Sequence, residues 1–406
     1  MINYNKILCT LCSLFLALYP WGSWIELNLF NIETNRGISS FIMILIIIIG
    51  ILNGNFTHGL RLYNKIKYLV IFIVFCTLGT LISGQLNSSF TILSFITYFM
   101  LIFIILGLNL SLLQISNFIK LIFYSTSLMV IISILDYHDL ISISGLNNSK
   151  FNNFDKTLGW INDLTGPFNS RTHFANHLSL VILLPLVYLS NEKKYFSVKS
   201  FFNFIVFLII IYAAILCHSR SLSVSIFLTF LLFLIINLKS NLFKLITLTT
   251  LFLLIIINLN TDFFEIVFHR FSSFDISNDN DGIRYTSFFQ TLNNLTDNPI
   301  GYGFSAPYSE SLEIVKDVHS NITYVLRAGG FIGFICLLIF FKHIVKKFIK
   351  FRITKTEQFI YIPIFSFLIF GISHTNITTS SFWFFIAFTF SMMHLNYKTN
   401  KIYQNK

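Results

Sequence analysis

Long apolar stretches separated by short polar connections run through most of this chain. Runs of about 17–21 residues with few charges recur, and each is long enough to cross a hydrocarbon core of about 30 Å as an α-helix. This pattern predicts an all-α polytopic membrane protein with about twelve transmembrane helices, in a single membrane domain that spans residues 1–406. We expect the helices at residues 7–24, 38–54, 66–84, 90–110, 117–135, 173–190, 201–217, 222–238, 242–260, 321–341, 359–374 and 380–396. The first run could be a signal peptide, but no small-residue cleavage pattern follows it, so we interpret it as a retained helix.

Two polar segments interrupt the alternation and are too long to be simple turns. The first covers residues 136–172, and the second covers residues 262–320 and holds nine of the 17 acidic residues. Within the second segment we expect one helix that lies on the membrane and another that begins near Asp281 and ends at Asn298. The apolar side chains of the latter share one face: Phe288, Phe289, Leu292 and Leu295. The pattern therefore predicts a partly helical extracytoplasmic loop that covers an active site.

Positive charges are distributed unevenly between the two sides that this helix arrangement creates. With the N-terminus in the cytoplasm, nineteen of the 28 lysines and arginines fall on cytoplasmic segments. This bias follows the positive-inside rule and predicts that both termini are cytoplasmic. The chain is 55% hydrophobic and only 11% charged, whereas a soluble domain carries about 25% charged residues. The net charge of +11 therefore reflects membrane topology, and we expect no nucleic-acid partner.

Metal and disulfide chemistry find little support in the sequence. The five cysteines all lie in or beside apolar runs and show no disulfide or metal-ligand spacing. His173 and His177 are one helical turn apart, but no third ligand is evident nearby. Asp279 and Asp281 match a short pattern of nucleotide-sugar enzymes, which we interpret as a solvated helix cap. We expect neither a metal nor another cofactor.

The charged residues that suit chemistry gather at the predicted outer face. Four arginines lie there: Arg171, Arg220, Arg270 and Arg284. A guanidinium forks onto phosphate oxygens, so arginines at a lipid–water boundary suit a diphosphate, although contacts with lipid headgroups would explain them as well. His319 comes directly before a predicted helix, whose positive end disfavours the imidazolium form. A neutral ring there could accept a proton as a general base, or it could simply cap the helix.

The predicted helices carry no charge in their middle thirds. No Asp, Glu, Lys or Arg falls near the centre of any of them. Ion-coupled transporters usually carry such groups where they bind the ion. This pattern disfavours a coupled transporter and places the chemistry at the outer face.

Four short motifs follow one another between about residues 160 and 335. They are Leu164-Thr-Gly-Pro-Phe-Asn before a helix, Ser219-Arg220 at a helix start, Asp297-Asn-Pro-Ile-Gly-Tyr-Gly-Phe, and His319-Ser320 followed after nine residues by Gly330-Phe-Ile-Gly. Their order and spacing together resemble the O-antigen ligase/polymerase superfamily. Members of that superfamily are bacterial membrane glycosyltransferases that use glycans linked to undecaprenyl diphosphate.

The resemblance implies an inverting, metal-independent glycosyl transfer at the periplasmic face of the inner membrane. Arg220 and Arg284 would hold the diphosphate of the lipid donor, with Arg171 and Arg270 as further candidates. His319 would deprotonate the acceptor hydroxyl. The implied partners are the undecaprenyl-diphosphate-linked glycan, membrane lipids, and either lipid A–core or a second lipid-linked glycan as acceptor. A chain-length regulator as a further partner is left open.

The chain departs from the family pattern at three places. Val224 stands where a leucine is expected, and Asp163 precedes the first motif where an arginine is common. His374 and Asn376 occupy the last outer loop, where an acidic residue is expected. The polymerase signature, an arginine followed after ten residues by a glycine, is also missing for the four outer arginines, which favours a ligase. An O-antigen or capsule polymerase is the alternative, and a non-enzymatic glycan-lipid transporter is the third hypothesis.

Overall fold

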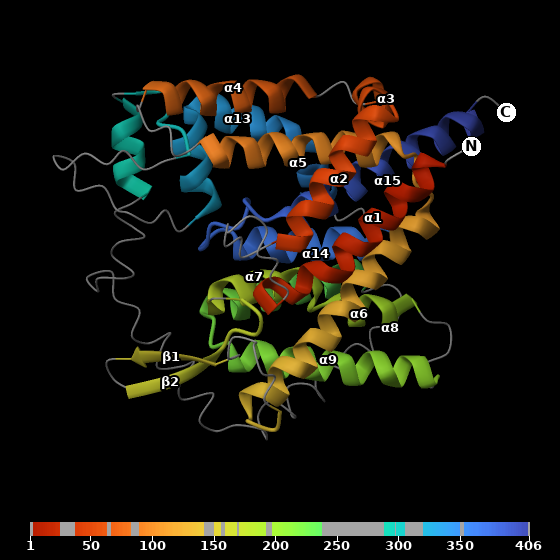
Figure 1. Cartoon of the computed structure of the whole chain (residues 1–406), viewed down its shortest axis with the longest axis vertical. Helices are drawn as coiled ribbons and strands as arrows, with labels where there is room; N and C mark the ends of the chain where they lie inside the picture. Colours follow the sequence, from red (N-terminus) through yellow and green to blue (C-terminus); the bar gives the residue numbers. More distant parts are fainter. Residues whose placement is uncertain are drawn as a thin grey trace.

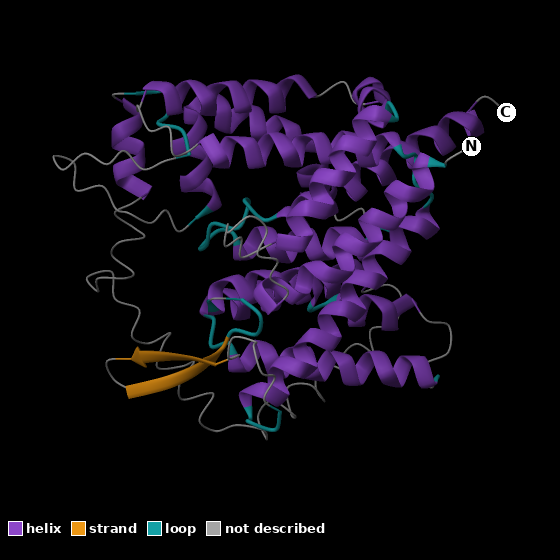
Figure 2. Ribbon diagram, in the orientation of Figure 1, coloured by secondary structure: helices purple, strands orange, loops and turns teal. Residues whose placement is uncertain are grey.

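The chain folds mostly into α-helices (Figure 2). A computed structural model describes residues 3–24, 37–62, 66–82, 89–141, 150–155, 159–168, 170–191, 197–237, 288–296, 298–304, 320–349 and 353–404. The prediction of a predominantly helical fold is confirmed for these residues.

The labelled helices follow the order that the apolar pattern predicts. Their bounds are α1 (Tyr4–Leu18), the 3-10 helix η1 (Tyr19–Trp24), α2 (Gly37–Leu52), α3 (Asn55–Leu62), α4 (Ile66–Ile82), α5 (Ser89–Gly107), α6 (Leu112–Tyr137), α7 (Arg171–Val181), α8 (Leu184–Asn191), α9 (Val198–Leu216), α13 (Asn321–Ile349), α14 (Gln358–Phe370) and α15 (Ser380–Gln404). Two further helices cover Arg220–Asn237, called here the Arg220 helix, and residues 288–296. The predicted helix 242–260 lies outside the described residues.

Four helices in the described part of the chain are long and apolar enough to cross a membrane. They are Leu112–Tyr137, Arg171–Asn191, Arg220–Asn237 and Asn321–Lys342. A fifth span results if α2 and α3, which meet at 79°, form one bent span. Five other helices have apolar parts of only 10–17 residues: Lys67–Ile82, Thr91–Gly107, Ser200–Leu216, Gln358–Phe370 and Ser380–Leu395. The number of about twelve transmembrane helices is therefore not confirmed, and neither is the extracytoplasmic position of the polar loops.

Helix boundaries differ from the prediction where the chain bends. We predict one helix over 173–190, whereas the chain forms α7 and α8, which are interrupted at Ile182 and Leu183. The cause is Pro185, which has no N–H to donate to the carbonyl of Val181 one turn earlier. An apolar pattern records which residues avoid water, and it does not record such breaks.

A short antiparallel hairpin stands where we predict only a loop. Strand β1 (Lys150–Asp155) pairs with β2 (Gly159–Leu164), with Lys150 opposite Leu164 and Asp155 opposite Gly159. Neither strand alternates strictly between apolar and polar residues, so the sequence carries no clear period-two signal. The hairpin ends at Asp163 and Leu164, immediately before the glycine turn of the first motif.

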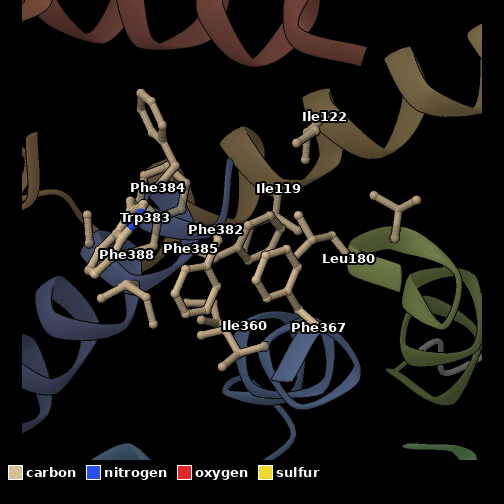
Figure 3. Close-up of a cluster of buried hydrophobic side chains, with 14 of the residues drawn as sticks. Ile119, Ile122, Leu180, Ile360, Phe367, Phe382, Trp383, Phe384, Phe385 and Phe388 are labelled. Carbon is tan, nitrogen blue, oxygen red and sulfur yellow. The ribbon is translucent and has the colours of Figure 1, made fainter. Parts of the chain in front are cut away.

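The core is centred on α15. Every residue from Phe382 to Phe388 is buried, as expected for a helix that is apolar all round and lies inside a bundle. Around it lie side chains of α14, α6 and α7, including Ile360, Ile119 and Leu180 (Figure 3). The rings of Phe367 and Phe382 stack with their centroids 4.5 Å apart. This core fixes α14, which carries the contacts that organise the candidate site.

The termini and the candidate site lie at opposite ends of the helices. Figure 1 shows both termini at one end of the molecule, and the hairpin and the segment 288–304 at the other. Helices α4, α5 and α13 run side by side, and α13 packs closely against α4. The polar segments that we predict to be extracytoplasmic thus share one end of the bundle, in their described parts.

Candidate active site

The structure describes two of the five residues that the sequence predicts for the site. Arg171 and Arg220 are described, whereas Arg270, Arg284 and His319 lie outside the described residues. The second polar segment is described at its end, where residues 288–296 form a helix as predicted. Of the four apolar residues expected on one face, Leu295 is buried and Phe289 is exposed, and the shared face stays a prediction. The Asp281 cap of the same helix is outside the described residues.

Arg220 is the first residue of its helix, directly after a tight turn from α9. His218 in that turn has a positive φ of 47°, a conformation that costs a residue other than glycine roughly 1–2 kcal/mol. Ser219 caps the helix, because its Oγ accepts a hydrogen bond from the N–H of Leu222 at 3.4 Å. The N-terminal end of the helix and its dipole both favour an anion beside Arg220.

Asp163 is a fully buried carboxylate that joins three segments of the chain. Its Oδ2 accepts a hydrogen bond from Nη1 of Arg171 at 2.8 Å, and its Oδ1 accepts one from Nδ1–H of His218 at 3.0 Å. Sγ of Cys217 also donates to the carbonyl oxygen of Arg171 at 3.3 Å. The end of β2, the start of α7 and the turn before Arg220 therefore form one connected unit.

The first motif makes the turn that brings Arg171 to Asp163. Gly166 has a φ of 54°, and the N–H of Phe168 donates to the carbonyl oxygen of Thr165 at 3.1 Å. The side chain of Ser170 then caps α7, of which Arg171 is the first residue. The unusual aspartate of this chain thus has a structural explanation, because it pairs with an arginine eight residues later.

The third motif docks on a break in α13. The N–H of Tyr302 donates to the carbonyl oxygen of Arg327 at 2.8 Å, and the N–H of Gly303 donates to that of Ala328 at 3.1 Å. These carbonyls are free because Gly330 has non-helical angles, φ 62° and ψ −167°. A Cβ atom on Gly330 would overlap the carbonyl oxygen of Pro299. The glycines of the third and fourth motifs are therefore parts of one close backbone contact.

Phe304, the last residue of the third motif, anchors that contact in the core. Its ring stacks on Phe95 of α5 with centroids 4.6 Å apart, and it meets Phe72 of α4 edge-on at 6.4 Å. It also tilts against Tyr324 of α13 at 5.7 Å. Three helices thus fix the segment that follows the helix at 288–296.

The start of α13 is held by the loop between α14 and α15. Oδ1 of Asn321 accepts hydrogen bonds from the N–H groups of Asn376 and Ile377 at 2.9 and 3.0 Å. Its Nδ2 donates to Oδ1 of Asn376 at 2.5 Å. His374 belongs to the same loop and stacks on Phe370 at 4.9 Å.

Helix α14 connects the Arg220 helix with the start of α13. Ser225, one turn below Arg220, donates to the carbonyl oxygen of Ser366 in α14 at 2.6 Å. At the other end of the same pair of helices, Nε2 of Gln358 donates to Oδ1 of Asn237 at 3.1 Å. The loop after α14 holds Asn321, so one helix places both the predicted phosphate-binding segment and the segment after the predicted base.

Two residues of this site have no assigned role in the sequence analysis. His218 lies in the turn before Arg220, and Asp163 is a departure from the family pattern. Neither reveals a role by spacing, because they are 55 residues apart and meet only through the fold. A candidate signal is the aspartate itself, since a carboxylate in an apolar region needs a cationic partner.

No metal-binding arrangement is found in the described part of the chain. Groups of three or more His, Cys, Asp and Glu side chains that could hold a metal ion are absent there. Of the histidine pair on α7, His177 is buried, with Nε2 2.9 Å from Oγ1 of Thr126, whereas His173 is exposed. The lack of a metal or cofactor stays a prediction.

These features define a polytopic helical membrane protein with a polar, arginine-containing site at one end of its bundle. Residues 205–338 match the family model described as O-antigen ligase. The match covers about a third of the chain and includes three of the four motifs. This match supports the predicted resemblance to the O-antigen ligase superfamily over residues 205–338, and members of that family are glycosyltransferase-like enzymes. No curated protein matches the chain.

Proposed function

We propose that this protein is an O-antigen ligase-type glycosyltransferase that moves a glycan from undecaprenyl diphosphate to an acceptor hydroxyl. The acceptor is lipid A–core, and the reaction takes place at the periplasmic face of the bacterial inner membrane. The observation that carries this proposal is the family match over residues 205–338, which includes Arg220, Arg284 and His319. Both termini lie in the cytoplasm, as the distribution of lysine and arginine favours.

In this reaction the acceptor oxygen attacks the anomeric carbon of the glycan from the side opposite the diphosphate. The new C–O bond forms as the bond from that carbon to the phosphate oxygen breaks, with inversion at the carbon. His319 accepts the hydroxyl proton, and undecaprenyl diphosphate leaves with the electron pair of the broken bond. The leaving group gains charge as it departs, so cationic groups around it lower the barrier.

Arg220 and Arg284 are the proposed contacts of the diphosphate, with Arg171 and Arg270 as further candidates. Support for Arg220 comes from its place in the first turn of a capped helix, where N–H groups and charge act on the same anion. Support for a shared site comes from α14, which connects the Arg220 helix to the residues after His319. No metal takes part in the proposed mechanism, because arginines neutralise the leaving diphosphate.

A polymerase of O-antigen or capsule repeats is the second candidate within the same superfamily. It would use the same donor and a second lipid-linked glycan as acceptor, with a chain-length regulator as a further partner. The missing arginine-to-glycine polymerase spacing favours the ligase. A transporter of glycan lipids is the third candidate, and it would need charged groups at membrane depth.

The test is a gel of surface lipopolysaccharide from a strain without this gene, beside the same strain carrying the gene on a plasmid. Lipid A–core without repeats, together with glycan that accumulates on undecaprenyl diphosphate, is the result expected for a ligase. Core that carries a single repeat would instead indicate the polymerase. An unchanged ladder in the mutant strain would refute both and direct attention to capsule or transport.

A further inference from the structure

Arg327 is the exception among the buried charged residues of the described chain. Three Asp, Glu, Lys or Arg residues are buried there: Asp163, Arg327 and Glu357. Asp163 pairs with Arg171, and Glu357 pairs with Lys347 at 2.8 Å. For the guanidinium of Arg327, no ion pair or hydrogen bond occurs within the described residues, although only 9% of the residue is exposed.

An arginine in this position is costly unless an anion joins it. Arg327 lies in a helix that is apolar enough to cross a membrane. A buried cation without a counter-charge strongly disfavours the folded state, and charged residues inside membrane segments mark binding sites for this reason. Snorkelling to the surface would relieve the cost, but with only 9% of the residue exposed the side chain has little contact with water.

Helix geometry directs Arg327 towards the predicted active site. Side chains of a helix tilt towards its N-terminus, and α13 begins only six residues earlier, which is about 9 Å at 1.5 Å per residue. Thr323, one turn before Arg327, lies on the same face, and so does Ser320 at the helix start. The hydroxyls of Ser320 and Thr323 are 2.8 Å apart. A polar stripe thus leads from Arg327 back to the residue after His319.

The backbone at Arg327 is held rigidly by the third motif. Its carbonyl oxygen accepts the hydrogen bond from Tyr302, and Tyr324 packs against Phe304 one turn away. A guanidinium on a fixed backbone loses little further freedom when it binds, so it is pre-organised for an anion.

We propose that Arg327 is a binding residue for a phosphate group of a lipid that enters beside the start of α13. Two sources share this chemistry. One is the diphosphate of the glycan donor, in which case the inference rests on the proposed function. The other is the headgroup phosphate of an anionic phospholipid of the bilayer.

The test measures binding by thermal unfolding of the purified full-length protein in detergent. Inorganic pyrophosphate and phosphatidylglycerol are titrated separately onto the wild type, Arg327→Gln and Arg327→Lys. Arg61→Gln is the matched control, because Arg61 is an exposed arginine on α3. Arg327→Met is measured without ligand.

We expect one of the two probes to stabilise the wild type, with an apparent Kd that rises about 10-fold or more in Arg327→Gln and less in Arg327→Lys. The control Arg61→Gln should bind like the wild type. Arg327→Met should raise the melting temperature of the ligand-free protein, because it removes an uncompensated charge. Stabilisation by pyrophosphate identifies the donor diphosphate, and stabilisation by phosphatidylglycerol alone identifies the bilayer lipid.

Two results would overturn the inference. One is that the probes stabilise the wild type and Arg327→Gln equally, or that they stabilise neither protein. The other is a lower melting temperature of ligand-free Arg327→Met, which would mean that the protein itself satisfies the guanidinium. Neither measurement requires glycan transfer, so a failure of the proposed enzymatic function would be recognised separately by the lipopolysaccharide gel.

Discussion

Gly330→Ala should destabilise this protein far more than Gly333→Ala, although the two glycines belong to one motif on one helix. Gly330 has φ 62° and ψ −167°, a region open almost only to glycine. A Cβ atom there would overlap the carbonyl oxygen of Pro299. At Gly333 the nearest atom, Cδ2 of Phe72, would lie 3.4 Å from the new Cβ, which is an ordinary contact.

The magnitude follows from three costs. The backbone conformation costs an alanine about 1–3 kcal/mol, and forcing a methyl group into a packed contact costs about 1–3 kcal/mol. If the docked segment moves away, the hydrogen bonds from Tyr302 and Gly303 to α13 are lost, at about 1 kcal/mol each. We expect a loss of about 3–6 kcal/mol for Gly330→Ala. For Gly333→Ala we expect a gain of up to about 1 kcal/mol, because alanine favours a helix over glycine.

The assay compares thermal unfolding of both variants and the wild type in the same detergent, together with their protein levels in the membrane. Gly330→Ala should melt well below the wild type, whereas Gly333→Ala should melt at or above it. Equal melting temperatures for the two variants would refute the close contact between the third motif and the break in α13. A lower melting temperature for Gly333→Ala alone would show that the close contact lies at Gly333 and not at Gly330.

Three further substitutions test the site, and a fourth, Glu357→Gln, is the control for the first. Asp163→Asn removes the charge that holds the turn before Arg220, so the KM for the donor should rise about 10-fold. Glu357→Gln breaks a similarly buried pair near the other end of α13, so it should lower the melting temperature and leave the KM for the donor unchanged. Equal effects of the two substitutions on the KM for the donor would contradict this prediction. His319→Ala should abolish surface glycan at a normal protein level, and an unaltered glycan ladder would rule out the base role. Asn321→Leu removes three hydrogen bonds to the loop after α14 and should cost about 2–4 kcal/mol in thermal unfolding, whereas a wild-type melting temperature would show that Asn321 does not hold this loop.

The helices could be predicted because burial in a membrane or core leaves a long apolar record in the sequence. The record is clearest where one element is buried all round, as from Phe382 to Phe388. The apolar pattern does not indicate where a helix bends, so the break before Pro185 and the turn between α2 and α3 were not predictable from it. The hairpin was not predicted for another reason. Its strands lack a strict alternation of apolar and polar residues, and their pairing is a contact between two separate segments.

The sequence singles out candidate residues for the site, but it does not show how they connect. The glycines at 301, 303 and 330 stand out in the motifs, but only the fold shows that Gly301 and Gly330 face one another across a backbone contact and that Gly303 faces Thr80 of α4. Asp163 and His218 meet across 55 residues of chain, and no local pattern indicates such a pair. Asn376, by contrast, stands out in the sequence as an unusual residue in the last loop, and its bonds to Asn321 explain why an amide suits that place.

Pairing separates the cations of this chain into two kinds. Arg171 already forms an ion pair with Asp163, so less of its charge is available to a diphosphate. Substitution of Arg171 would also leave the buried carboxylate of Asp163 without this cation. Lys347 is bound in the same way to Glu357. Arg327 differs from both, since within the described residues its buried charge is uncompensated. Substitution of the paired cations should therefore act mainly on folding. Substitution of Arg327 should act on ligand binding and leave the ligand-free fold as stable as before or more so.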